Sequence, residues 1–139
     1  MKISAHVDNS FRKHLVTLAT DGRARDLTIA PKPEGVGSSA NGGELLCLAL
    51  ATCYCNDLYR EAKKRGIEVL RVEVDAEATF GAEGAGAERL AYHARVSARA
   101  SLQEILELMR HTDRVAEIQN TLRGSCPVVF TGADAQEAE

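Results

Sequence analysis

The sequence predicts an α+β protein built around one long helix. Segments 70–80 and 90–100 alternate apolar and polar residues, which is the pattern of half-buried strands. Segment 41–65 begins with an apolar run and turns charged after Cys55, which is the pattern of a helix buried on nearly every side. With the shorter segments described next, these observations predict the element order β-β-β-α-β-β-α-α-β.

The first forty residues predict three strands and a loop. Apolar and polar residues alternate over 3–8, which indicates a first strand. Strands are also expected over 12–20 and 23–30, joined by Asp21-Gly22, a dipeptide typical of a tight hairpin turn. Segment 31–40 is rich in Pro and Gly, so we expect an irregular loop there.

The long helix has start and stop signals at both ends. Asn41 and Glu44 form a capping-box pattern, and Gly66 follows a basic last turn. One small sheet can cover only one side of such an apolar helix. We therefore expect a second copy of the chain to cover the other side.

The second half of the chain predicts a sheet followed by two helices. The acidic face of 70–80 and the basic face of 90–100 favour antiparallel pairing with cross-strand ion pairs. Ser101 and Glu104 form a second capping box, which starts a helix. A third helix is expected to begin at Thr112 or Asp113 and to end at Gly124. A last strand over 126–130 and an acidic, disordered tail over 132–139 complete a single domain of residues 1–131.

Composition excludes several classes of function. The net charge is −3 without a basic stripe, so nucleic acid is not an expected partner. The longest apolar run is about half of the ~20 residues that cross a bilayer, and Met1–Ser4 does not resemble a signal peptide. Three of the four cysteines lie in one predicted helix, which is unlike a secreted disulfide framework. We expect a cytoplasmic protein with reduced thiols and no membrane association.

Several of these motifs together resemble the OsmC/Ohr family. A Gly/Ser-rich loop precedes Glu44-Leu45-Leu46, Cys53 lies in the middle of the long helix, and Arg65-Gly66-Ile67-Glu68-Val69 leads into the alternating strands. The resemblance covers about residues 3–131. It implies an intertwined homodimer with active sites near the subunit interface, and reduction of organic hydroperoxides without a cofactor. In such members a helix thiolate attacks the peroxide, and a second cysteine resolves the sulfenic acid as a disulfide.

The resemblance assigns candidate catalytic residues. Cys53 matches the reactive cysteine. Ala116 occupies the position of the resolving cysteine, and Cys126 lies ten residues further on. Arg23 is the better match of the hairpin arginines that hold the thiolate. Glu44 matches the acidic partner in some branches; nine helical positions separate it from Cys53, so it belongs either to the cap or to the site of the other subunit.

Other polar and thiol groups have alternative interpretations. Cys47 and Cys55 share one helical face and are interpreted as packing residues. The Cys-x-Cys spacing disfavours a zinc site. His111 and Asp113 lie beside the position of the missing resolving cysteine, where they either cap a helix junction or handle protons in place of that thiol.

Three functions are compatible with the sequence. The first is a thiol peroxidase that uses Cys53, with Cys126 or an external thiol completing the cycle. Its apolar hydroperoxide would approach along Leu46, Leu50 and Tyr54. The second is a one-cysteine redox protein whose oxidised Cys53 is reduced by an unidentified thiol. The third is a non-catalytic binding or stress protein that retains the fold.

Overall fold

The computed structural model describes residues 1–139 as an α+β chain, which confirms the predicted fold class and element order. The chain divides into two compact units, Met1–Leu45 and Leu46–Glu139, because the strands form two separate sheets. The single domain expected over 1–131 stays a prediction. No helix combines the length and the apolar character that crossing a lipid bilayer requires. The elements are β1 (Ile3–Ser10), β2 (Lys13–Thr20), β3 (Arg23–Leu27), α1 (Gly42–Lys64), β4 (Glu68–Phe80), β5 (Ala87–Arg99), α2 (Leu102–Val115), α3 (Glu117–Arg123) and β6 (Val128–Glu137).

The first unit is an antiparallel sheet in the order β1-β2-β3. Asp21 and Gly22 have φ angles of 48° and 78°, as a tight hairpin turn requires. β3 ends at Leu27, three residues earlier than expected, and a single bridge between Pro31 and Ser38 closes the following loop. Val16 is the only buried hydrophobic residue of this sheet, so the first unit has almost no core of its own.

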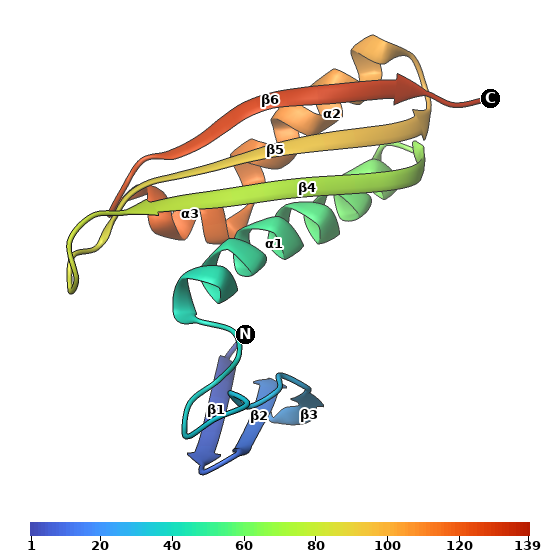
Figure 1. The fold of residues 1–139 in the computed structure, drawn as a ribbon. Coiled ribbons are helices and arrows are strands. Elements are labelled where there is room, and N and C mark those ends of the chain that lie inside the picture. The colour runs from blue at the N-terminus through green and yellow to red at the C-terminus, as the bar shows by residue number, and fades with distance from the viewer. The chain divides into compact units, whose positions relative to one another are not determined.

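The second unit packs two helices on one face of the sheet β4-β5-β6. β4 and β5 are antiparallel, whereas β5 and β6 are parallel. Figure 1 shows α1 and α2 on the same side of this sheet. The core between the two layers consists of Tyr54, Leu58, Ala62, Tyr92, Ala94, Val96, Ala98, Ile105, Leu108 and Met109.

The uncovered face of the second sheet carries the predicted ion pairs. Arg95 lies 2.7 Å from Asp75, and Arg99 lies 2.6 Å from Glu68, in each case across the β4–β5 pair. The complementary charges of the two alternating segments therefore do face each other.

Both capping boxes are confirmed. The Glu44 and Asn41 amides each donate to the other residue's side chain at the start of α1, and Ser101 and Glu104 do the same at α2. α1 ends as predicted, because Gly66 has a φ of 67° and follows the last turn.

α1 buries one stripe within this chain. The stripe runs from Leu50 to Ala62, whereas Leu48 and Tyr59 on other faces are 55% and 45% exposed. The sequence predicted burial on nearly every side, and a single copy supplies only part of that cover.

Two boundaries differ from the predicted ones. The Thr112 hydroxyl donates to the Leu108 carbonyl inside α2, so neither Thr112 nor Asp113 caps a helix. The break lies at Ala116, whose ψ of 114° is extended. β6 continues to Glu137, where a disordered tail was expected from residue 132, because parallel pairing with β5 supplies hydrogen bonds as far as Ala98.

Candidate functional site

Cys53 lies on α1 at the edge of the helical stripe that faces α2 and α3. Its side chain is half-buried, and its thiol donates to Asp57 Oδ2 at 3.5 Å. Glu117 Oε2, on the first residue of α3, lies 4.0 Å from the sulfur. Two carboxylates from two helices therefore face this thiol.

Arg60 connects the two carboxylates. One of its terminal nitrogens lies 2.9 Å from Asp57 Oδ1 and 3.2 Å from Glu117 Oε1. The Arg60 side chain is 41% exposed and that of Glu117 is 64% exposed, whereas Asp57 is almost fully buried. The cluster of Cys53, Asp57, Arg60 and Glu117 thus opens to solvent on one side, and a small molecule can approach it from there.

The chain folds so that these residues meet for three local reasons. Positions 53, 57 and 60 are separated by four and three residues, which places them on one face of a helix. The extended backbone at Ala116 stops α2 and starts α3 in a new direction at Glu117. The buried side chain of Gln119 donates to the Leu50 carbonyl at 3.1 Å and fixes α3 against α1.

The surroundings of Cys53 favour its neutral thiol. Burial raises the pKa of the Cys53 thiol, the Ile118 amide lowers it, and the negative charges of Asp57 and Glu117 raise it further. The net effect is a pKa above the ordinary value, so the thiolate is a minor species at neutral pH.

The two carboxylates differ from each other in acidity. Burial, and a hydrogen bond to Glu117, raise the pKa of Asp57 to about 6. The hydrogen bond from Asp57 and the nearby Arg60 lower the pKa of Glu117. Near pH 6 the Asp57 carboxyl therefore titrates, whereas Glu117 is ionised.

A second charged network adjoins Arg60. The buried carboxylate of Glu61 accepts hydrogen bonds from Arg60 at 2.9 Å and from Lys64 at 2.8 Å, and it lies 3.1 Å from His111 Nε2. Lys64 and Arg60 lower the pKa of Glu61 to about 2. His111 therefore contacts the ion-pair network of α1 and not Cys53.

Asp113 belongs to a separate network. It accepts hydrogen bonds from the Tyr92 hydroxyl and from Arg123, the latter at 2.6 Å. Tyr92 in turn stacks on Phe130, with ring centroids 4.9 Å apart. These contacts connect α2, α3 and the sheet, which favours the interpretation of Asp113 as a residue of the helix junction.

The position that a resolving cysteine would occupy is inaccessible to solvent. Ala116 is fully buried at the turn between α2 and α3. Cys126 is half-buried beyond α3, where its amide donates to the Leu122 carbonyl, and all four cysteines are free thiols. The hydrogen bonds of the Cys53 sulfur go to Asp57 and Glu117, and neither goes to Cys126.

Arg23 and Glu44 belong to the first unit. Arg23 is the exposed first residue of β3, where it pairs with Thr20. Glu44 is exposed, and its carboxylate accepts a hydrogen bond from the Asn41 amide at 2.9 Å. This contact is that of a helix-capping residue. The roles implied for them by the family resemblance stay predictions.

Two of the residues that were expected to line the substrate's approach to Cys53 lie inside the core. Leu50 and Tyr54 are fully buried, and Tyr54 donates to the Met109 carbonyl at 2.9 Å, so neither can contact a substrate. Cys47 and Cys55 are half-buried, and burial raises the pKa of both thiols. Cys55 borders a shallow cavity beside Val72 and Val74, and its interpretation as a packing residue stays a prediction.

Three donors of the cluster are close enough together for a metal ion. Cys53, Asp57 and Glu117 offer a sulfur and two oxygens, all within 4.8 Å of one another. Such ligands suit a divalent ion. However, Arg60 already contacts both carboxylates, and a cation bound there would have to displace it. The donor set therefore fits an ion poorly while Arg60 is in place.

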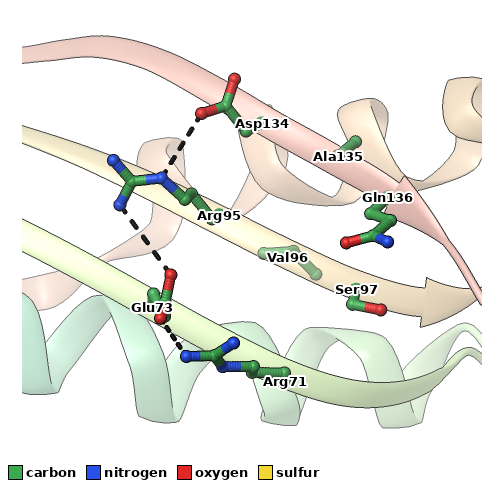
Figure 2. A pocket seen from close by; sticks show the side chains of 8 residues that line it. All are labelled: Arg71, Glu73, Arg95, Val96, Ser97, Asp134, Ala135 and Gln136. Atoms are coloured by element: carbon green, nitrogen blue, oxygen red, sulfur yellow. Dashed lines mark hydrogen bonds and ion pairs between the residues drawn. The ribbon is translucent and has the colours of Figure 1, made fainter.

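A cavity without Cys53 lies on the outer face of the second sheet. It measures about 370 Å³ and is bordered by Arg71, Arg95 and Ser97. Figure 2 shows that Arg95 lies between Glu73 and Asp134, and that Arg71 also contacts Glu73. These charges are paired with each other, so the cavity is a surface depression among ion pairs.

Comparison with known proteins identifies the family. A model of the family described as OsmC-like protein matches residues 35–131, which include α1, the cluster around Cys53 and most of the second sheet. The chain belongs to the OsmC-like family. No curated protein matches it significantly.

Solved structures share this OsmC-like fold at low sequence identity. An OsmC-like protein from Mycoplasma pneumoniae is 18% identical with a TM-score of 0.65, and the match covers 99% of this chain and 96% of the other. A hypothetical protein from Aquifex aeolicus is 13% identical with a TM-score of 0.75, covering 100% and 99%. An organic hydroperoxide resistance protein OsmC from Legionella pneumophila is 20% identical with a TM-score of 0.64, covering 96% and 97%.

Sequence reasoning selected Cys53 but missed the residues that surround it. Asp57 and Arg60 could have been found from their helical spacing to Cys53, since both lie on its face of α1. Glu117 could not, because its proximity to Cys53 depends on how α3 packs on α1, 64 residues away in sequence.

Proposed function

We propose that this OsmC-like chain is a thiol-dependent redox protein that reduces organic hydroperoxides through Cys53. The observation that carries the proposal is the arrangement at Cys53, a half-buried thiol that faces two carboxylates and a guanidinium and is open to solvent on one side. Membership of the OsmC-like family supports a redox or stress function.

The reaction needs one thiol and one hydroperoxide. The Cys53 sulfur attacks the outer peroxide oxygen, the O–O bond breaks, and the products are a sulfenic acid on Cys53 and an alcohol. The sulfur is oxidised and the peroxide is reduced. A stabilising partner for the departing alkoxide is required, and Arg60, which contacts both carboxylates beside Cys53, is the proposed cation.

We propose that an external thiol reduces the oxidised Cys53. The buried Ala116 at the resolving position supports a one-cysteine cycle. Cys126 as an internal resolving thiol is the alternative, and it would require its Cα to approach that of Cys53 to within roughly 7 Å. Arg23 and Glu44 are retained as proposed contributors, testable by Arg23→Ala and Glu44→Gln in the same assay.

We also propose a homodimer in the cytoplasm. The support is the apolar surface left exposed in a single copy, which includes Ile3 at 67%, Val7 at 56% and Leu48 at 55%.

One observation favours a non-catalytic binding protein instead. The pKa of the Cys53 thiol is raised, and a thiol with little thiolate at neutral pH is a weak nucleophile. In that case the chain would keep the fold and Cys53 would be a structural residue.

Oxidation of the reduced protein distinguishes these functions. Wild type, Cys53→Ser and Cys126→Ser are each treated with a small excess of cumene hydroperoxide, followed by thiol counting and intact mass measurement. A gain of one oxygen that requires Cys53 alone supports the one-cysteine cycle. Loss of two thiols that requires both cysteines supports Cys126 as the resolving thiol. No reaction of wild type would rule out the redox function and favour the binding protein.

A further inference from the structure

The geometry points to Asp57 as the catalytic base and acid of the Cys53 reaction: it takes the thiol proton as sulfur attacks the peroxide and delivers that proton to the departing alkoxide. This inference rests on the function proposed above and assigns the proton transfers of that reaction to one residue.

The contact with the sulfur is the first support. The Cys53 thiol donates to Asp57 Oδ2 at 3.5 Å, which is within hydrogen-bonding distance for sulfur. Both residues lie on α1 four positions apart, so the contact is built into the helix and does not depend on a loop. A base in contact with the proton that it removes satisfies the geometric requirement for general base catalysis.

The neutral state of the thiol is the second support. Because the surroundings of Cys53 disfavour the thiolate, the proton must leave during the attack, and a base must be present at that moment. Asp57 has a pKa of about 6, so it is ionised at pH 7 yet is a stronger base than an ordinary aspartate.

The surrounding charges allow Asp57 to hold a proton only transiently. From α1, Arg60 contacts Asp57 at 2.9 Å and favours its ionised form. From α3, Glu117 accepts a hydrogen bond from protonated Asp57 and favours the neutral form. The more distant Glu61, Lys64 and His111 bond one another or Arg60 and do not contact Asp57.

The proposed step balances in atoms and electrons when the hydroperoxide is the oxidant. The Cys53 S–H proton passes to the Asp57 carboxylate while sulfur bonds the outer oxygen and the O–O bond breaks. The outer oxygen keeps its own hydrogen and becomes the sulfenic acid. Protonated Asp57 then gives its proton to the alkoxide, which leaves as an alcohol, and the carboxylate is regenerated.

Two reagents distinguish a catalytic role of Asp57 as a base from a purely structural role. Asp57→Asn removes a negative charge that raises the thiol pKa, so alkylation of Cys53 by iodoacetamide at pH 7 should become faster. Oxidation by cumene hydroperoxide should become slower, by about 10²-fold, which is the lower end of a typical general acid–base contribution. A structural defect would change both rates in the same direction. Asp75→Asn, an exposed carboxylate on β4, and Cys55→Ser are matched controls that should change neither rate.

The pH profile gives a test that does not require Asp57→Asn to fold. In wild type, the rate of oxidation should rise between pH 5 and 7 as Asp57 ionises. In Arg60→Gln the midpoint of that rise should move to higher pH, because the guanidinium favours the ionised carboxylate.

The possible outcomes distinguish failure of the redox function from failure of Asp57 as the base. If wild-type Cys53 does not react with the hydroperoxide, both the redox function and this inference are overturned. If Cys53 reacts but Asp57→Asn reacts as fast or faster, only Asp57 as the base is overturned. A wild-type profile that rises only at alkaline pH, with no change near pH 6, would also overturn it.

Discussion

The two sheets of this chain each have three strands, yet their surroundings differ. In the first sheet Val16 is the only buried hydrophobic residue, whereas β5 alone buries six in the second sheet. Two helices cover one face of the second sheet, and Met1–Leu45 contains no helix beyond the first turn of α1. A sheet becomes stable when an apolar layer covers one of its faces, so the first unit needs a cover that it does not contain.

The buried charges are also confined to one region. The buried charged residues are Asp57 and Glu61, both on α1 within the second unit. Arg60 contacts both carboxylates, and Asp57 also contacts the candidate reactive thiol. Large pKa shifts of carboxyl groups are therefore expected in the second unit, because a neighbouring charge has a stronger effect on a buried group than on an exposed one.

A matched pair of leucines measures the difference between the sheets most directly. Leu58→Ala removes a side chain that is fully buried in the second unit and should lower the free energy of unfolding by about 2–5 kcal/mol. Leu15→Ala removes one that is 49% exposed in the first unit and should cost less than about 1 kcal/mol. Urea unfolding at low micromolar protein gives both values. Equal losses would contradict the comparison and would indicate that something covers Leu15 in solution.

The exposed face of the first sheet should be sensitive to charge if a second copy covers it. Val7→Asp should weaken self-association by at least about tenfold, because burying an unpaired carboxylate costs more than about 1.4 kcal/mol. His6→Asp, whose side chain points to the other face of β1, is the control. Sedimentation equilibrium gives the dissociation constants. A monomeric wild type would refute the proposed dimer.

Acid should destabilise the second unit through Glu61. The pKa of Glu61 is lowered to about 2 by Lys64 and Arg60, below its value in the unfolded chain. Its contribution to stability is therefore complete above about pH 4.5 and is lost as the pH falls toward 2. Glu61→Gln should be less stable than wild type at pH 7, and the difference should shrink at pH 2–3. Urea midpoints across this range provide the measurement; a constant difference would contradict the ion pairs as its cause.

The ion pairs on the outer face of the second sheet should contribute least. Arg95 is about half exposed and contacts Asp75 at 2.7 Å and Asp134 at 3.6 Å. Arg95→Ala should cost less than about 1 kcal/mol, and the cost should decrease in 1 M NaCl because solvent and salt screen exposed charges. Arg89→Ala, an exposed arginine of the same strand that forms no ion pair, is the control in thermal unfolding.

Most of the fold followed from local patterns. The alternating segments became β4 and β5, both capping boxes formed, and Asp21-Gly22 made the hairpin turn. The errors lie where local signals were weak or misleading. Thr112 and Asp113 have the chemistry of capping residues, but their positions lie within α2, and no sequence signal marked Ala116 as the break.

The candidate site was predictable in part. Cys53 was selected by its family position, and Asp57 and Arg60 share its helix face. The implied partners Arg23 and Glu44 are exposed in the first unit, whereas the charged groups in contact with Cys53 come from α1 and α3.

The sequence by itself determined the α+β class, the order of the elements, the ends of the long helix and the identity of the thiol. Each depends on residues within one turn or one strand repeat of each other, where steric and hydrogen-bonding preferences act directly. The tertiary structure decided that β6 extends to Glu137, that α2 breaks at Ala116 and that Glu117 reaches Cys53. Those features depend on strand pairing and helix packing between distant segments, whose energies are absent from any local stretch of sequence.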